Sequence, residues 1–358
     1  MPDEVHRPIR VVQWATGNIG RRSLRGVIEH PSLELTGVLV YSPEKAETDA
    51  GELCGLGPCG VVATDDVDEI VALGADCALY MPRGGSVEEI CRLLAAGTNV
   101  VTTTGEFHRP DGLDAGVRAE VEAACRRGGT SVHSTGSSPG FITEAVPLVL
   151  TSIQRRLDRL VIDEYADLSQ RPSPELLFDL MGFGRPPSAM TEGRDEYLKS
   201  SFGPSLELVA DALSIPLDTV EAEGEVATAR VSTTIAAGTV AAGTVAGQRT
   251  TVSGTRSGYP VLQFRATWYC TPDLDPAWEV RPTGWHVSVE GDAPLDVDLR
   301  FAVPLERMAA MSPAYTANRA VNVVPFVCAA PPGIVSSVDL PQIVAELGSV
   351  ASQVAPLL

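Results

Sequence analysis

The feature that most constrains the fold is a turn of small residues near the N-terminus, with the sequence A-T-G-N-I-G. An apolar run over 9–14 leads into it, as in a buried parallel strand, and a helix is predicted over 18–30. Strand, turn and helix together match the dinucleotide-binding fingerprint, in which the helix N-terminus holds the phosphate charge. The alternative is an ordinary strand–turn–helix corner. The predicted cofactor contacts in the turn are Ala15, Thr16, Gly17, Asn18, Ile19, Gly20 and Arg21.

Strands and helices continue to alternate after this turn. Further strands are predicted over 35–41, near residue 61, and over 76–81, 99–103 and 131–134. Helices are predicted over 65–73, capped by Thr64, over 86–96, with a capping box of Ser86 and Glu89, and over 114–127. This alternation predicts a doubly wound parallel sheet of the Rossmann type.

The pattern changes after Gly140. A long helix is predicted over 141–157, a strand over 160–164, and irregular and helical chain over 168–215. Residues rich in Val and Thr then alternate, which predicts an open, largely antiparallel sheet with strands over 225–234, 239–248, 261–269, 285–290 and 296–301. Helices are predicted over 315–324 and 342–358. The fold class is therefore α/β: a Rossmann domain over 1–140, an α+β substrate-binding domain over 141–304, and C-terminal helices over 305–358 that pack back on the first domain.

Composition limits the possible partners. The formal charge is −19 and the pI about 4.6, which argues against nucleic acid and anionic membranes as partners. No apolar run has membrane-spanning length, and the polar start MPDEVHRP has no signal-peptide core. Seven scattered cysteines indicate reduced thiols rather than a metal site. We therefore expect a cytoplasmic protein without a metal.

The end of the second predicted strand bears on the choice of cofactor. In such folds an acidic residue there favours NAD, whereas hydroxyl and basic groups accommodate the extra phosphate of NADP. Here Tyr41-Ser42 is followed by Lys45, and Arg21 begins the preceding helix. We predict that NADP(H) is preferred, with Ser42 and Lys45 as contacts. NAD(H) is possible because Glu44 could hold the ribose hydroxyls.

One carboxylate follows the predicted strand 99–103, in T-T-G-E. Ligands bind at the carboxyl edge of such sheets, so Glu106 is expected near the reacting end of a nicotinamide. A carboxylate there can hold an ammonium or iminium group and can move a proton. The alternative is a solvated loop glutamate.

The loop G-S-S-P-G-F closes the first domain, and its polar groups could bind the nicotinamide amide. A plain interdomain turn is the alternative. His108, His133 and His286 are more often structural in such contexts. The remaining predicted cofactor contacts are Met81, Pro82, Thr103, Thr104, Ser138 and Asn322.

Four motifs together carry a family resemblance: W-A-T-G-N-I-G, T-T-G-E-F, S-S-P-G-F and T-A-N-R-A-V-N. The chain resembles the dihydrodipicolinate reductase-like proteins, and within them 2,4-diaminopentanoate dehydrogenase and the native amine dehydrogenases. The resemblance implies a Rossmann domain joined to an open-sheet domain that forms a homodimer. It implies reductive amination of small ketones or aldehydes with ammonia and NAD(P)H, or the reverse deamination. Glu106 matches the family's catalytic glutamate.

The sequence departs from the pattern of its relatives in two ways. The paired-histidine motif of dihydrodipicolinate reductases is missing, and Ser138 stands where relatives often have asparagine. The predicted substrate pocket comprises Phe141, Thr143, Tyr165, Phe178, Met181, His286 and Thr316. Two other functions stay open: a different NAD(P)-dependent carbonyl or semialdehyde oxidoreductase, and a regulatory NADPH-binding protein without turnover.

Overall fold

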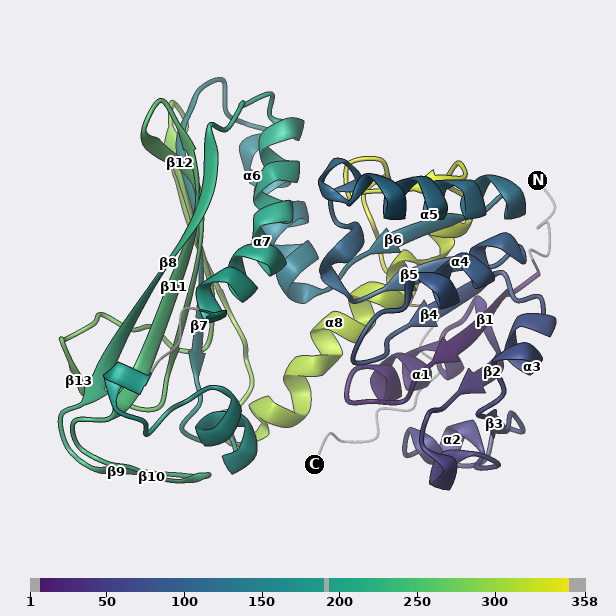
Figure 1. The fold of residues 1–358 in the computed structure, drawn as a ribbon, viewed down its shortest axis with the longest axis horizontal. Helices are drawn as coiled ribbons and strands as arrows, with labels where there is room; N and C mark the ends of the chain where they lie inside the picture. The colour runs from purple at the N-terminus through teal and green to yellow at the C-terminus, as the bar shows by residue number, and fades with distance from the viewer. Residues whose placement is uncertain (1–6, 190–192, 348–358) are drawn as a thin grey trace. The chain divides into compact units, whose positions relative to one another are not determined.

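The computed structural model describes residues 7–189 and 193–347, and the chain divides into two compact units (Figure 1). Unit 1 comprises the chain up to Ser137 and the chain from Pro313 onward. Unit 2 comprises residues 138–312. Each unit is built on a seven-stranded sheet.

The sheet of unit 1 is parallel throughout and has the strand order β16-β6-β5-β4-β1-β2-β3. Its strands are β1 (Ile9–Trp14), β2 (Leu33–Leu39), β3 (Ala63–Thr64), β4 (Cys77–Tyr80), β5 (Asn99–Thr102), β6 (Ser131–Ser134) and β16 (Gly333–Ile334). The order reverses between β1 and β4. Ligands bind at such a switch point, outside the carboxyl ends of the strands.

Helices cover both faces of this sheet. They are α1 (Gly20–Ile28), α2 (Ala50–Leu53), α3 (Val67–Ala72), α4 (Val87–Ala95), α5 (Ala115–Gly128) and α8 (Leu305–Cys328). Figure 1 shows α4 and α5 beside β5 and β6. Alternate strand residues such as Val12 and Tyr80 pack in the core that contains α4 and α5, and Val11 and Leu79 pack in the core that contains α1 and α8. Both faces are therefore apolar, as expected for a parallel sheet.

The predictions for unit 1 need three corrections. Asp66, not Thr64, caps α3, because its carboxylate accepts the N–H groups of Asp68 and Glu69. The chain between β2 and β3, where no helix was predicted, contains α2, which Asp49 caps. The helix predicted over 342–358 is not formed over 342–347, and its remainder lies outside the described residues.

The sheet of unit 2 is mixed, with the order β13-β8-β11-β12-β7-β14-β15. Its strands are β7 (Leu157–Asp167), β8 (Thr219–Ala229), β11 (Val245–Arg256), β12 (Tyr259–Tyr269), β13 (Leu274–Asp275), β14 (Gly284–Gly291) and β15 (Leu295–Arg300). β12 and β7 pair in parallel, whereas the other neighbours are antiparallel. The expectation of a largely antiparallel sheet is confirmed, with this one parallel pair as the exception. β9 (Thr233–Ile235) and β10 (Gly238–Val240) form a separate hairpin.

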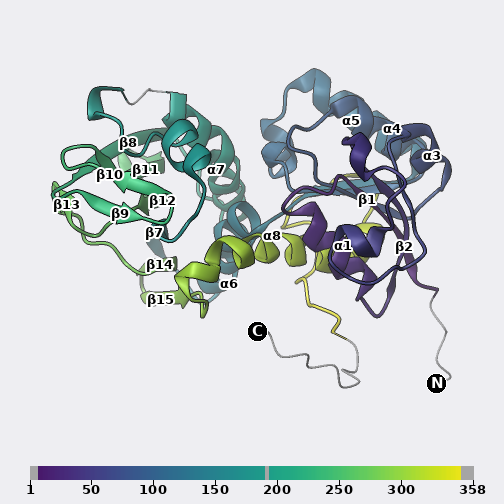
Figure 2. The same ribbon diagram turned by 90° about the horizontal axis from the view of Figure 1, so that it is seen from below.

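The two faces of this sheet differ. Alternate residues such as Ile162, Phe264 and Val287 pack with α6 (Val146–Thr151) and α7 (Gly193–Ala212), and we call this the covered face. Figure 2 shows α7 beside the row of strands from β8 to β15. The residues between them point the other way and are largely polar, and we call this the open face. The open face carries Arg159, Asp163, Arg249, Gln263, Arg265, His286 and Ser288.

The helix predicted over 141–157 is shorter than expected. A π-helical stretch over Ser137–Ala145 contains a kink at Ser138, Pro139 and Gly140, and α6 ends at Thr151. Leu157 already belongs to β7, which is longer than the predicted strand. The apolar run Leu148–Leu150 has no helix breaker after it, so the sequence does not mark this end.

Candidate active site

The fingerprint turn is held by a buried glutamine in β1. Gln13 is fully buried, and its amide donates to the Ala15 carbonyl at 3.0 Å and to the Leu79 carbonyl at 3.2 Å. Its Oε1 accepts the Ser23 hydroxyl from α1 at 2.5 Å. This side chain therefore links β1, β4 and α1 beneath the turn. Sequence reasoning missed it, although a glutamine in an apolar strand was a usable signal.

The small residues of the turn have distinct tasks. Ala15 has φ +70°, a left-handed conformation that glycine adopts more easily. A Cβ on Gly20 would lie 2.2 Å from the Ala15 carbonyl oxygen, so helix and strand meet closely there. A Cβ on Gly17 would meet nothing within 4 Å, and Gly17 is exposed. The backbone at Gly17 is therefore open to a ligand.

The N-terminus of α1 has no side-chain cap and no acidic residue in its first turn. In the same unit, α4, which has nine residues like α1, is capped by Ser86, and the longer α5 is capped by Asp114. An uncapped N-terminus leaves backbone N–H groups and the positive dipole end available to an anion. These residues fit the pyrophosphate of a dinucleotide.

Residues after β2 lie beside the turn. Ser42 precedes a 3-10 turn over Pro43–Lys45, and the Lys45 ammonium donates to the Thr16 carbonyl at 3.4 Å. The Arg22 guanidinium donates to the Asn18 side chain at 2.6 Å. Arg21 is exposed. The fold thus brings Lys45 and its positive charge to the turn.

Residues at the ends of β4 and β5 complete this edge of unit 1. Met81 is buried, with its sulfur 3.2 Å from the Ser23 hydroxyl, and its N–H donates to the Trp14 carbonyl. The Thr104 N–H donates to the Thr102 hydroxyl at 3.2 Å. Pro82 and Thr103 follow the same two strands. Of these predicted contacts, Met81 has a packed side chain and serves the core beneath the turn.

Glu106 lies in the 3-10 turn Gly105–Phe107 that directly follows β5. The turn is anchored by Phe107, which is fully buried and whose N–H donates to the Ser134 hydroxyl at 3.1 Å. Glu106 itself is exposed, and a Cβ on Gly85 would lie 3.4 Å from its carboxylate. The carboxylate therefore lies close to the loop after β4, at the carboxyl edge of the sheet.

The loop after β6 has an unusual backbone. The Ser138–Pro139 peptide is cis, and Gly140 has φ +115°. The Thr143 hydroxyl is fully buried and accepts the Gly140 N–H at 2.9 Å, so this predicted pocket residue supports the loop. The Ser138 hydroxyl is buried and has no hydrogen-bond partner within the described part of the chain.

Two further predicted residues lie on α8 in unit 1. The Ser137 and Thr316 hydroxyls lie 2.8 Å apart. Asn322 lies on the same helix as Thr316, and its side chain is partly buried.

The predicted pocket residues of unit 2 fall in three places. Phe141 packs on Trp285 of the covered face, with ring centroids 6.1 Å apart. Tyr165 and His286 lie on the open face and line a cavity of about 260 Å³ with Arg281. Phe178 and Met181 belong to a separate core with Leu177. Because the sheet lies between Phe141 and the pair Tyr165 and His286, one pocket within unit 2 cannot hold all three.

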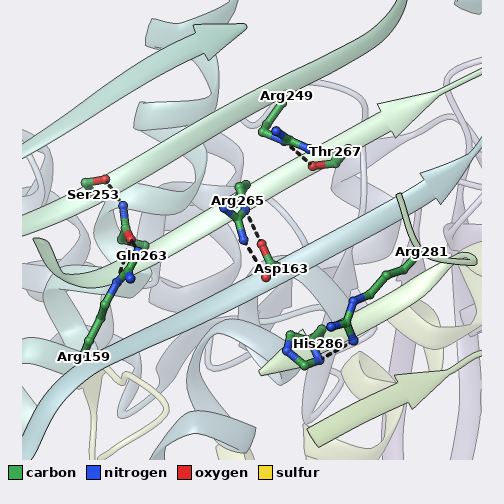
Figure 3. A network of polar contacts seen from close by, with 9 residues as sticks. All are labelled: Arg159, Asp163, Arg249, Ser253, Gln263, Arg265, Thr267, Arg281 and His286. Atoms are coloured by element: carbon green, nitrogen blue, oxygen red, sulfur yellow. Dashed lines mark hydrogen bonds and ion pairs between the residues drawn. The ribbon is translucent and has the colours of Figure 1, made fainter. Parts of the chain in front are cut away.

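The open face carries a network of charged side chains (Figure 3). Arg265 donates to both carboxylate oxygens of Asp163, at 2.5 and 3.0 Å, and Asp163 is only 3% exposed. His286 Nδ1 lies 2.9 Å from both Arg281 and Asp298. The hydrogen bond from His286, together with the Arg281 charge, lowers the pKa of Asp298. His286 thus has charged partners, which fits a structural role on this face.

Within residues 7–189 and 193–347, no group of three or more metal-ligating side chains occurs and no helix has the length and apolarity to cross a membrane. All seven cysteines are free thiols. A parallel sheet with an uncapped glycine turn at its switch point defines a nucleotide-binding dehydrogenase fold.

Comparison with known proteins identifies the family. The chain belongs to the family described as the 2,4-diaminopentanoate dehydrogenase C-terminal domain, whose model matches residues 141–355. Residues 10–127 match the dihydrodipicolinate reductase N-terminus. The chain is 29% identical to an amine dehydrogenase from Streptomyces virginiae, over 93% of this chain and 96% of that one. Over 65 residues it is 32% identical to a 4-hydroxy-tetrahydrodipicolinate reductase from Synechococcus elongatus, 18% of this chain and 24% of that one.

A solved structure shares the whole fold. The amine dehydrogenase from Mycobacterium smegmatis superposes with a TM-score of 0.75 at 21% identity, over 96% of this chain and 99% of that one. The chain is thus an amine dehydrogenase homologue with an NAD(P)-binding dehydrogenase fold. The predicted fold class and the family resemblance are confirmed.

Proposed function

We propose that the protein is an NAD(P)H-dependent amine dehydrogenase that acts on CH–NH₂ groups. It would reductively aminate small ketones or aldehydes with ammonia, and deaminate the amines in reverse. The observation that carries this proposal is Glu106, an exposed carboxylate at the same sheet edge as the open Gly17 backbone. Among the described residues no side chain forms a hydrogen bond or ion pair with Glu106, so its carboxylate is available to a substrate nitrogen.

The chemistry assigned to Glu106 is proton transfer and charge stabilisation. Its carboxylate takes a proton from ammonium, which leaves ammonia free to attack the carbonyl carbon. The protonated acid returns that proton to the hydroxyl group, which leaves as water, and the restored carboxylate pairs with the iminium cation. A bound nicotinamide supplies the hydride that reduces the iminium carbon. The sum is carbonyl, ammonium and hydride to amine and water.

The cofactor would bind along the edge of unit 1. We assign the pyrophosphate to the turn from Ala15 to Gly20, and the nicotinamide end to Pro82, Thr103 and Thr104, all in unit 1. The hydroxyl of Ser138, the first residue of unit 2, stays a separate predicted contact. Asn322 belongs to the same proposed set. NADP(H) is preferred over NAD(H) in this proposal, because Lys45 brings its positive charge to the Thr16 carbonyl, Ser42 directly precedes the turn that carries Lys45, and Arg21 is exposed in the first turn of α1.

Three further assignments are proposals of the same kind. Phe141 in unit 2 and, separately, Thr316 in unit 1 each remain a predicted substrate contact, while Thr143, Tyr165, Phe178, Met181 and His286 have packing or network roles that compete with that assignment. A homodimer, which the family resemblance implies, would use the open face of unit 2, the face of the sheet that α6 and α7 leave uncovered. Seven free thiols are consistent with a cytoplasmic location.

The test follows NADPH and NADH oxidation with small ketones and aldehydes, with and without ammonium. Oxidation that requires both carbonyl and ammonium is expected. Oxidation with carbonyl alone would make the protein a carbonyl reductase, and cofactor binding without any turnover would favour a regulatory role. Glu106→Gln should abolish amination and leave the Kd for NADPH within about twofold. Amination that survives in Glu106→Gln would remove this residue from its assigned role.

A further inference from the structure

A tyrosine at the carboxyl edge of unit 1 is attached to the fold through its hydroxyl group. Tyr41 follows β2, two residues after that strand ends. Its hydroxyl accepts the indole N–H of Trp14, the last residue of β1, at 2.8 Å, and donates to the Glu89 carboxylate on α4 at 3.0 Å. The hydroxyl of Tyr80, the last residue of β4, donates to the same carboxylate at 2.6 Å. The network therefore links the ends of β1, β2 and β4, which lie next to one another in the sheet (Figure 1).

The exposure of Tyr41 is the reverse of that of most tyrosines. A tyrosine that serves packing buries its ring and leaves its hydroxyl near water. Tyr41 is 53% exposed, although its hydroxyl reaches the fully buried Trp14. The exposed surface of this side chain therefore lies mainly on the ring. Partial burial, together with the charge of Glu89, raises the pKa of the Tyr41 phenol, so the hydroxyl keeps its proton and remains a donor to the carboxylate at neutral pH.

The groups that hold Tyr41 are themselves fixed. The Glu89 N–H donates to the Ser86 hydroxyl at 3.3 Å, and the Ser86 N–H donates to the Tyr80 hydroxyl at 2.9 Å. The rings of Trp14 and Tyr80 lie 5.7 Å apart between centroids. Because its hydroxyl is bound on two sides, the Tyr41 ring has few orientations, and covering it with a ligand costs little additional ordering. The ring is thus a preorganised surface for a flat ligand.

The position of Tyr41 indicates which flat group this is. In dinucleotide-binding sheets the end of the second strand lies beside the adenosine ribose. The loop after β2 also reaches the fingerprint turn, since the Lys45 ammonium donates to the Thr16 carbonyl at 3.4 Å. A nucleic-acid base has a π face that stacks on aromatic side chains. Adenine is therefore the group of a dinucleotide that fits an exposed ring at this place.

We propose that the exposed ring of Tyr41 is the surface on which the adenine of the cofactor stacks, and that Glu89 is a positioning residue that holds this ring in place. The indole N–H of Trp14 has the same task from β1. The inference rests on the cofactor binding of the proposed function, but it depends neither on amination nor on the choice between NADP(H) and NAD(H). In this assignment Tyr41 recognises the base, and Ser42 and Lys45 remain the contacts predicted for its ribose.

The first experiment measures equilibrium binding of the two halves of the cofactor separately. ADP carries the adenine, and reduced nicotinamide mononucleotide carries the nicotinamide without it. We expect Tyr41→Leu to raise the Kd for ADP by about 10-fold or more, and to change the Kd for the mononucleotide by less than about twofold. Tyr259→Leu removes a tyrosine that is 74% exposed in unit 2 and should change neither value. An equal loss of affinity for both ligands in Tyr41→Leu would make Tyr41 a structural residue and overturn the proposal.

Two conservative variants test how the ring is held. Tyr41→Phe keeps the ring and removes its attachment, so the Kd for ADP should rise by about threefold, less than in Tyr41→Leu. Glu89→Gln removes the charge that the Tyr41 hydroxyl meets, and it should change the two Kd values in the same way as Tyr41→Phe. A loss in Tyr41→Phe as large as that in Tyr41→Leu would overturn stacking on the ring. An unchanged Kd for ADP in Glu89→Gln would overturn the positioning role of Glu89.

These measurements separate the inference from the proposed function, because neither ligand is turned over. A loss of affinity confined to ADP in Tyr41→Leu supports stacking even if no carbonyl is aminated, in which case only the proposed function fails. Unchanged ADP binding in Tyr41→Leu would place Tyr41 outside the adenine site, and tighter binding would mean that its ring occupies that site. Either result would overturn the inference even if amination is observed.

Discussion

The two seven-stranded sheets differ in how many of their faces are packed against helices. In unit 1 both faces are covered, and neighbouring residues such as Val11 and Val12 both lie in apolar cores. In unit 2 only the covered face is apolar, so Ile162 lies in the core whereas Asp163 beside it lies in a charged network. Two sheets of seven strands can therefore leave different surfaces free to bind other molecules. In unit 1 both sheet faces are packed against helices, so a ligand can reach the sheet only at the ends of its strands. In unit 2 one face is packed in a core and the other carries charged side chains.

The largest effect is expected at the turn of unit 1. Gly20→Val places a Cβ 2.2 Å from the Ala15 carbonyl oxygen, and backbone there cannot move aside without shifting α1. We expect a loss of at least about 3 kcal/mol in the free energy of unfolding, with loss of NADPH binding. Urea denaturation and NADPH fluorescence measure the two effects. Gly17→Ala is the matched control: a Cβ there meets nothing within 4 Å, so stability should hold while cofactor affinity falls. Equal destabilisation by both variants would contradict the division of tasks.

The next effect tests the open face of unit 2. Asp163→Ala leaves the Arg265 guanidinium without its bidentate partner. Because the Arg265 side chain is 35% exposed, we discount the cost of breaking a buried pair to about 2 kcal/mol. Urea denaturation measures the effect, and the double variant Asp163→Leu with Arg265→Leu should recover part of it. A change below about 0.5 kcal/mol would mean that the pair is solvated, and that the two sheets are less different than we infer.

A smaller effect is expected at alkaline pH, and it involves both units. Burial raises the pKa of Cys125 in unit 1 to about 11 and that of Cys270 in unit 2 to about 12. The folded protein holds these thiol protons more tightly than the unfolded chain, so their contribution to stability is complete below about pH 9 and is lost as pH rises towards those values. Tm should fall by roughly 2–4 °C per unit of pH above 9. Cys125→Ala and Cys270→Ala should each reduce this slope, and a Tm that is constant up to pH 11 would contradict the burial argument.

The smallest effect concerns backbone strain. Ala15 has φ +70° in unit 1, and Ser214 has φ +56° after α7 in unit 2. Glycine at either position removes about 1 kcal/mol of strain but costs nearly as much unfolded-state entropy, so each variant should gain about 0.5 kcal/mol or less. Thermal unfolding of Ala15→Gly and Ser214→Gly checks this. If Ala15→Gly also changes the Kd for NADPH, the left-handed backbone at Ala15 contributes to cofactor binding, which is not expected of Ser214.

Most of the sheet of unit 1 could be predicted from the sequence, because strands such as β1, β4 and β5 are short runs rich in apolar residues that end in turns. β16 has only two residues and was not predicted. β1 and β6 were predicted at their observed bounds. In unit 2 the alternation of residues identified strands, but it marks faces and not neighbours. The parallel pairing of β7 with β12 joins residues about a hundred positions apart, such as Asp163 and Arg265, so no local pattern encodes it.

The residues of the candidate site also differ in whether the sequence could predict them. The turn from Ala15 to Gly20 and the position of Glu106 follow from local sequence, because each adjoins a predicted strand. In unit 2 the carboxylate of Glu164 accepts the indole N–H groups of Trp268 and Trp285, which lie on the two neighbouring strands. No local sequence pattern predicts that these three residues meet. Gln13 is an intermediate case. The sequence shows a glutamine within an apolar strand, but it does not predict which groups the amide bonds.

α8 has a consequence for biosynthesis. The core of unit 1 includes Val321 and Val324 of this helix, packed with Val11 and Leu79 from the start of the chain. A ribosome that has completed β6 must still translate all of unit 2 before it reaches those valines, a delay on the order of 10 s at usual elongation rates. During that interval the part of the sheet face that α8 covers is exposed to solvent and to other nascent chains, while α1 can already cover the rest. Newly made unit 1 should therefore need a chaperone until the last part of the message has been read.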